Sequence, residues 1–129
     1  MKKLKVYYAH SVAIYNTPQE ERDIATLKAL GFEIVNPNSP KIEAQYSGML
    51  GKVPYEVMFD EVFGNAVRAC DLVAFRAIPS SNRIGSGVAL EITYAEEAEL
   101  PIIELPGCLN SRRMTVEETK EHLRECGHR

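Results

Sequence analysis

A carboxylate on the apolar side of a predicted helix is the feature of this sequence that most clearly suggests chemistry. With 3.6 residues per turn, Glu91 projects between Val88, Ala95 and Ala98. Burying a lone carboxylate costs several kcal/mol unless the group is paired or neutralised, so such a residue often belongs to a functional site. The pattern leaves two interpretations open: a functional acid, or an acid at the edge of the core that reaches toward solvent or pairs with an arginine.

The segment before this helix combines glycines, hydroxyl groups and one cation. Residues 80–87 place Arg83, Gly85, Ser86 and Gly87 at the start of the helix. Backbone amides at a helix N-terminus bind anions such as phosphate. The segment is neither a Walker A loop nor a complete dinucleotide fingerprint, and glycines before a helix can serve only the turn. Phosphate binding and a plain loop therefore both stay open.

Strand and helix signals alternate along the chain. Strands are predicted at residues 4–9, 32–35, 72–75 and 101–105. Helices are predicted at residues 17–30, from 54 or 55 to 69, from the glycines at 85–87 onward, and from 115 toward the C-terminus. Thr17, Pro18 and Glu20 supply the N-cap, first-turn proline and capping-box acid of the first helix, which should stop at Gly31. Residues 41–53 have no clear period and are predicted to form a lid or a crossing loop.

This alternation predicts one domain over residues 1–129, with a doubly wound, mainly parallel sheet in three α/β/α layers of the flavodoxin or Rossmann-like type. Ligands of such sheets bind beyond the carboxyl ends of the strands. Three segments should meet there: residues 9–11, residues 36–38 and residues 79–87. For His10, in the first segment, ligand contact and simple solvation are both open.

The composition favours a globular protein that handles small polar ligands. A formal net charge of −3 gives no broad basic surface for duplex nucleic acid or an anionic membrane. The three cysteines form no CxxC pair, which favours a reducing compartment. Because the N-terminus shows no signal-peptide pattern and no apolar run is long enough to span a bilayer, we expect a cytoplasmic location.

The sequence also carries a family resemblance. The pattern G-x-x-x-E-x-x-Y-A at residues 87–95, following the segments at residues 5–9 and 70–75, resembles the nucleoside 2-deoxyribosyltransferase-like proteins. That family includes the deoxynucleoside 5′-monophosphate N-glycosidases. The resemblance covers roughly residues 4–105 and agrees with the fold expected from the pattern of elements.

The resemblance implies an enzyme that acts on an N-glycosidic bond. Glu91 would be the nucleophile that attacks C1′ of the deoxyribose and forms a glycosyl-enzyme intermediate, a role that suits a carboxylate. Asp71 would be a second catalytic acid, but it opens its strand, about 15–20 Å from the expected site, so a structural role is equally open. Asp71, Asp60 and His10 are the candidates for protonating or hydrogen-bonding the departing base.

The remaining implied contacts define a substrate site without a metal or another cofactor. Its predicted residues are Tyr7, Tyr8 and His10 around the sugar or base, Arg83, Gly85, Ser86 and Gly87 around a 5′-phosphate, and Asn110, which would complete a neighbouring subunit's site in a homodimer or higher homo-oligomer. Gly85 stands where transferases of this family commonly have an acid and the monophosphate hydrolases a serine. The base, and the choice between transfer and hydrolysis, are therefore open. A nucleotide-binding protein without turnover and an NAD- or ADP-ribose-processing enzyme are the alternatives.

Several other residues allow structural interpretations. Glu56 in a first helical turn can simply favour the helix dipole. Phe59 and Phe63, four apart on one helix face, are predicted to be core residues. His122, Cys126 and His128 can be drawn as a metal cluster, but they lie on a fraying helix and lack a fourth ligand.

Overall fold

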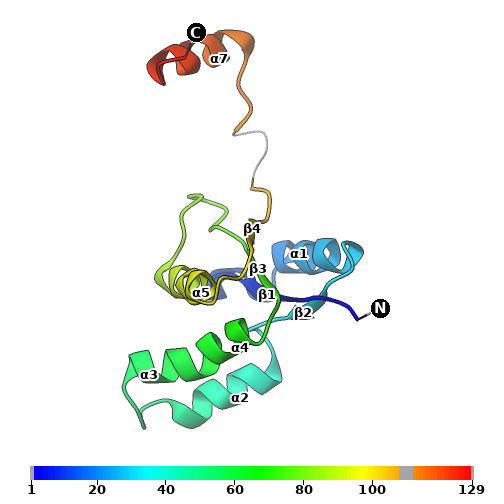
Figure 1. Cartoon of the computed structure of the whole chain (residues 1–129), viewed down its shortest axis with the longest axis vertical. Coiled ribbons are helices and arrows are strands. Elements are labelled where there is room, and N and C mark those ends of the chain that lie inside the picture. Colours follow the sequence, from blue (N-terminus) through cyan, green and yellow to red (C-terminus); the bar gives the residue numbers. More distant parts are fainter. Residues whose placement is uncertain (1, 108–111, 129) are drawn as a thin grey trace.

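A computed structural model, which describes residues 2–107 and 112–128, contains a four-stranded sheet (Figure 1). The strands, in chain order, are β1 (Lys5–Ala9), β2 (Glu33–Val35), β3 (Leu72–Phe75) and β4 (Ile102–Glu104). Their order across the sheet is β2-β1-β3-β4, and every neighbouring pair is parallel. The predicted doubly wound α/β fold is confirmed.

Helices connect these strands. In chain order they are η1 (Val12–Ile14), α1 (Pro18–Ala29), α2 (Pro40–Met49), α3 (Tyr55–Phe59), η2 (Asp60–Gly64), α4 (Asn65–Arg68), α5 (Ser86–Glu97) and α7 (Val116–Glu125). The expected ends of α1 are confirmed, because the Thr17 hydroxyl accepts a hydrogen bond from the Glu20 N–H and Gly31 follows the helix with a φ of 91°. The expected capping box is not, since the Glu20 carboxylate accepts from the Asn16 N–H at 3.0 Å instead.

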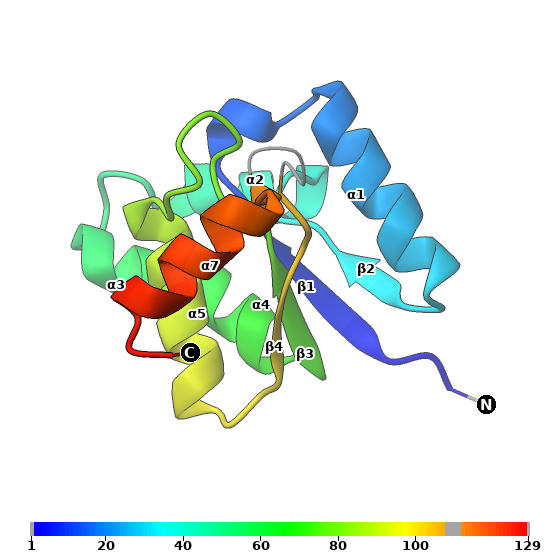
Figure 2. The ribbon, with the colours of Figure 1, turned by 90° about the horizontal axis from the view of Figure 1, so that it is seen from above.

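Side chains of each strand alternate between the two faces of the sheet, and each face is covered by helices (Figure 2). Tyr7 and Val73 pack in one cluster with residues of α4 and α5. Tyr8 and Ala74 pack in another with Leu27 of α1. Both central strands are therefore buried on both faces, which explains their nearly continuous apolar sequences.

The helix α2 corrects the prediction of an irregular lid at residues 41–53. The hydroxyl of Ser39 caps the helix by accepting from the Ile42 N–H, and Pro40 occupies its first turn. Ile42 is buried with Met58 and Val62 in a third cluster. The cap and proline repeat the pattern that begins α1, so the signal was present but had been assigned to the turn after β2.

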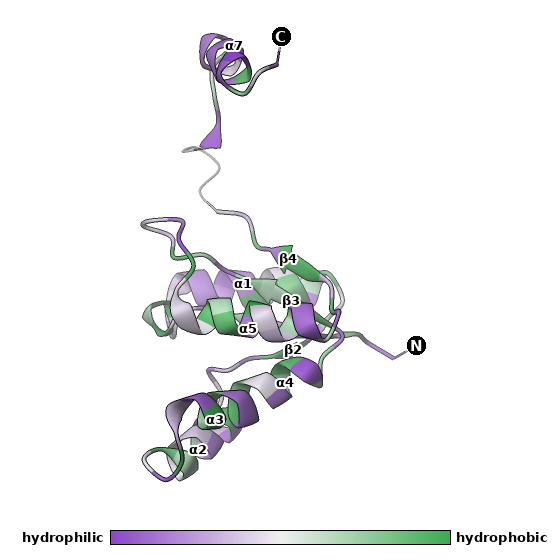
Figure 3. Ribbon diagram, turned by 60° about the vertical axis from the view of Figure 1, so that its left-hand side comes forward, coloured by the Kyte–Doolittle hydropathy of each residue, from purple (hydrophilic) through white to green (hydrophobic). Residues whose placement is uncertain are grey.

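The C-terminal helix α7 differs from the others because it buries none of its residues. Its expected capping box forms in both directions between Thr115 and Glu118. Most of its residues are hydrophilic (Figure 3). Across the described ranges, no helix is long and apolar enough to cross a membrane.

Candidate active site

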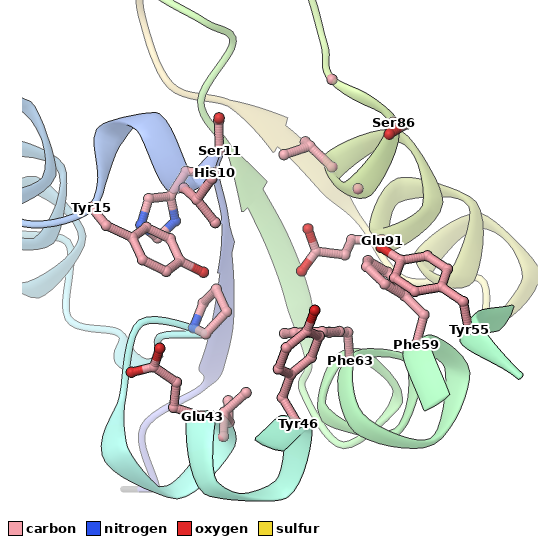
Figure 4. A pocket seen from close by; sticks show the side chains of 16 residues that line it. His10, Ser11, Tyr15, Glu43, Tyr46, Tyr55, Phe59, Phe63, Ser86 and Glu91 are labelled. Carbon is pink, nitrogen blue, oxygen red and sulfur yellow. The ribbon is translucent and has the colours of Figure 1, made fainter. Parts of the chain in front are cut away.

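A cavity of about 430 Å³ lies where the carboxyl ends of β1, β2 and β3 meet (Figure 4). Its volume is within the usual range for small-molecule sites. The chain order reverses between β1 and β3, and such a switch point is where ligands bind in open parallel sheets. The lining residues are His10, Ser11, Val12, Tyr15, Pro37, Ile42, Glu43, Tyr46, Tyr55, Phe59, Phe63, Gly85, Ser86, Gly87, Val88 and Glu91.

Helix α5 carries Glu91 to the wall of this cavity. Val88 and Ala95, one turn before and one turn after, pack into the core beside β1 and β3 and fix the rotation of the helix. Glu91 is consequently 4% exposed. Its carboxyl group points toward the cavity in Figure 4. The expectation that this acid lies on the buried face of its helix is confirmed.

The hydroxyl group of Tyr7 donates a hydrogen bond to the Glu91 carboxylate. No cation pairs with Glu91 among the described side chains. Burial raises the pKa of Glu91 to about 8, although the hydrogen bond from Tyr7 acts in the opposite direction. Glu91 is thus held in one position and titrates close to neutral pH, as a catalytic carboxyl group can.

The start of α5 supplies polar backbone groups to the same cavity. Gly85 is the N-cap and has no side chain to satisfy the first helical amides. Ser86 and Gly87 follow it along the cavity wall. These amides, with the positive end of the helix dipole, can bind an anionic group such as a phosphate.

His10 lies at the end of β1 in a buried polar network. Its Nδ1 faces the Tyr8 carbonyl oxygen at 2.9 Å, and its Nε2 faces the Glu20 carboxylate at 2.7 Å. Each ring nitrogen of His10 therefore has an oxygen partner inside this network. Asn38 also donates to Glu20, from the segment after β2. His10 therefore borders the cavity with both ring nitrogens already engaged by buried partners.

Aromatic side chains form a wall of the cavity. Phe59 is buried and Phe63 packs against the core, as predicted, and both also line the cavity. Their ring centroids lie 4.6 Å apart, and Tyr46 of α2 lies 6.0 Å from Phe63. The two phenylalanines stand on a helix whose middle turn, η2, is a π-helix. π-Helical turns occur frequently at functional sites.

The sequence analysis missed the acidic and phenolic lining residues Tyr15, Glu43, Tyr46 and Tyr55. Tyr15 follows η1 and turns its hydroxyl toward the cavity (Figure 4). Burial raises the pKa of Tyr15, and the carboxylates of Glu91, Glu20 and Glu43 raise it further. Glu43 stands on α2, which was predicted to be irregular, so its direction was not predictable there.

Other predicted site residues lie apart from this cavity. Asp71 accepts a hydrogen bond from the Lys5 N–H at 2.7 Å, at the opposite end of β1 and β3. Tyr8 faces α1, where its hydroxyl donates to Asp23. Arg83 is exposed and does not line the cavity. Asp60 pairs with Arg68 at 3.0 Å. Asn110 lies outside the described residues.

The histidines and cysteine near the C-terminus do not form a metal site in the described part of the chain. Cys126 Sγ and His122 Nε2 lie 3.6 Å apart. No group of three or more suitable ligands occurs within residues 2–107 and 112–128. These two side chains are explained by their spacing of one helical turn.

Comparisons with known proteins assign no family to the chain: no protein-family model matches it, and no curated protein matches its sequence.

Proposed function

We propose that this protein cleaves or transfers at the N-glycosidic bond of a 2′-deoxynucleoside or its 5′-monophosphate, with Glu91 as the nucleophile. The observation that carries the proposal is the Glu91 carboxyl group, buried beside Tyr7 at the wall of the cavity. Because its pKa is raised by burial, its ionised form destabilises the folded protein. A charge that costs stability and lies at a ligand-sized cavity is better explained by catalysis than by folding.

The chemistry follows from the position of the carboxylate. Glu91 attacks C1′, the electron pair of the C1′–N bond leaves with the base, and an ester to Glu91 forms through an oxocarbenium-like state. Water or a second base then attacks C1′ and releases Glu91. Only ionised Glu91 can attack, and the positive charge that develops on the sugar favours that form. Tyr7 holds the attacking group in place.

The start of α5 supports a 5′-phosphate on the substrate. Ser86 and the amides that follow Gly85 lie along the same wall as Glu91, about one turn and a half away on the helix. Ser11, after β1, borders the cavity as well. We propose that these groups bind the phosphate when the substrate has one, without a contribution from Arg83.

The proposal is tested by identifying reaction products with mass spectrometry. Wild type, Glu91→Gln and Glu96→Gln are incubated with the deoxynucleosides, their monophosphates and NAD, with and without an acceptor base. Glu96 is an exposed acid on the same helix and provides the matched control. We expect free base, or an exchanged nucleoside, from wild type and Glu96→Gln but not from Glu91→Gln.

Other products would identify the two alternative functions. If nicotinamide released from NAD is the only product, the substrate is a dinucleotide and not a deoxynucleoside. If the protein retains a nucleotide but forms no product, its function is binding and not catalysis. Equal turnover by wild type and Glu91→Gln would remove Glu91 from the mechanism.

The proposal includes the cellular setting expected from the sequence. We propose a cytoplasmic protein that works on small molecules as a homodimer or higher homo-oligomer. Light scattering on the purified full chain measures the assembly, and a monomer at the concentration of the activity assay would contradict this part.

A further inference from the structure

The direction of attack determines where the departing base must lie. In a displacement at C1′, the nucleophile and the leaving group occupy opposite sides of the reacting carbon. Glu91 approaches from α5, so the base lies across the cavity from that helix. Figure 4 shows Glu43, in the first turn of α2, on the far side of the cavity from Glu91, and Ile42 and Tyr46 of the same helix also line the cavity.

The structure of α2 explains why Glu43 faces the cavity. Ser39 caps the helix and Ile42 anchors it in the core, which fixes the rotation of the first turn. Glu43 and Tyr46 are three residues apart and therefore share a face. Glu43 forms no ion pair with any described cation, so its carboxylate is available to a ligand.

The charges around the cavity favour a ligand that donates hydrogen bonds. The lining contains the carboxyl groups of Glu43 and Glu91, and neither lysine nor arginine occurs among the described lining residues. His10 also lines the cavity, but its Nε2 is already paired with the Glu20 carboxylate at 2.7 Å. A carboxylate only accepts hydrogen bonds, so a carbonyl oxygen facing Glu43 would be repelled whereas an amino group would be bound.

The aromatic wall next to Glu43 fits a flat ring. Tyr46 and Phe63 lie with their ring centroids 6.0 Å apart, and Tyr46 follows Glu43 by one turn. Nucleobases stack on such side chains whatever their hydrogen-bonding edge. Stacking therefore retains the base, and the choice among bases is left to polar groups at its edge.

We infer that Glu43 determines base specificity, by accepting a hydrogen bond from the exocyclic amino group of the base. This inference rests on the proposed function and narrows its substrates to amino-bearing bases over their oxo counterparts. Deoxycytidine is preferred to deoxyuridine, and deoxyadenosine to deoxyinosine, because the exocyclic group that faces Glu43 is an N–H donor in the first member of each pair and a carbonyl acceptor in the second. The neighbouring ring nitrogen changes in the opposite sense, so the preference requires Glu43 to face the exocyclic group.

The test compares kcat/KM for these two pairs of substrates in wild type, Glu43→Gln and Glu56→Gln. Glu56 is also an exposed acid in the first turn of a helix but does not line the cavity. We expect wild type and Glu56→Gln to prefer the amino member of each pair by about tenfold or more, which corresponds to roughly 1.4 kcal/mol. Glu43→Gln, whose amide can both donate and accept, should bring both ratios near one.

The outcomes separate this inference from the proposed function. If wild type turns the substrates over but Glu43→Gln keeps both ratios, the inference fails and the function stands. If no substrate is turned over, the proposed function is wrong. The preference within each pair is then measured as a ratio of dissociation constants. Equal affinities within both pairs would then overturn the inference as well. A role of Glu43 restricted to the helix dipole would change the melting temperature without changing either ratio.

Discussion

The two faces of β1 each carry a buried tyrosine that donates to a carboxyl group. Tyr7 and Tyr8 are adjacent in the strand and fully buried. Tyr7 donates to Glu91 on α5, and Tyr8 donates to Asp23 on α1 at 2.6 Å. The pairs have the same chemistry, yet their surroundings differ.

The difference is the presence of a cation. Arg76 donates to both oxygens of Asp23, from Nη2 at 2.6 Å and from Nε at 3.0 Å. Burial alone would raise the pKa of Asp23, but the hydrogen bonds from Arg76 and Tyr8 outweigh it and keep the pKa below its ordinary value. Glu91 has no such partner among the described residues, and its pKa is raised to about 8.

This contrast separates a carboxylate that is paired within the fold from the one that we propose to be catalytic. Arg76 also donates to the backbone carbonyl groups of Leu105 and Pro106, so the Asp23 pair connects α1, the end of β3 and the segment after β4. The charges of Asp23 and Arg76 therefore pair with each other at a point where several elements of the fold are connected. Glu91 stays without a counterion where a ligand can enter, so its charge is available for a reaction.

The largest expected effect is on catalysis at Glu91. Glu91→Gln should lower kcat by about 10³-fold or more, because the amide cannot form the glycosyl-enzyme ester. Asp23→Asn should change kcat little once the rate is corrected for the folded fraction. Steady-state kinetics on both variants measure the contrast. Equal losses would show that the two carboxylates do not differ in the proposed way.

The Asp23 carboxylate should stabilise the folded protein at neutral pH, whereas ionised Glu91 destabilises it. Asp23→Asn leaves the buried Arg76 guanidinium without its counterion, so the free energy of unfolding should fall by about 3–5 kcal/mol at neutral pH. The stabilisation from ionised Asp23 is present above its unfolded pKa, near 3.8, and is lost as the pH falls through its lower folded pKa. Urea titration of wild type and Asp23→Asn measures the difference. A loss below about 1 kcal/mol would contradict it.

The raised pKa of Glu91 should make the folded protein less stable as the pH rises. Between its ordinary pKa of 4.5 and its folded pKa of about 8, Glu91 binds more protons in the folded than in the unfolded protein. Wild type should therefore lose stability relative to Glu91→Gln as the pH rises through this window, by about 4–5 kcal/mol in total. Urea titrations at pH 5, 7 and 9 measure the difference between the two proteins. A constant difference across these pH values would show that the carboxyl group is not perturbed.

The chain's periodicity was sufficient to predict most of this architecture. The apolar strands, the Thr17-Pro18 cap and the glycine after α1 specify parallel β-α units, and the helical projection placed Glu91 on a buried face. These signals depend on residues close together in the chain, so they can be recognised from a single sequence. The helix α2 was missed because Ser39-Pro40 also suits the turn that closes β2.

Tertiary partners were the part that the sequence could not specify. Nothing local distinguishes Tyr7 from Tyr8, because the side of the sheet that each faces depends on the register with β3. Glu20 was assigned to a capping box, whereas its carboxylate binds His10 and Asn38, the latter from 18 residues away. Glu43 needed a helix of known rotation before its direction could be predicted.

The smallest expected effect comes from removing one hydroxyl on each face. The hydrogen bond from Tyr7 lowers the pKa of Glu91, so Tyr7→Phe should move that pKa above about 8 and shift the rise of kcat with pH to more alkaline values. Tyr8→Phe should leave the pH profile unchanged, because Arg76 still holds Asp23. Both variants should lose about 1–2 kcal/mol of stability, as expected for one buried hydrogen bond. The measurement is the dependence of kcat on pH in Tyr7→Phe and Tyr8→Phe. A shift in both variants, or in Tyr8→Phe alone, would mean that the two faces of β1 are coupled. The proposed division between a structural and a catalytic carboxylate would then be wrong.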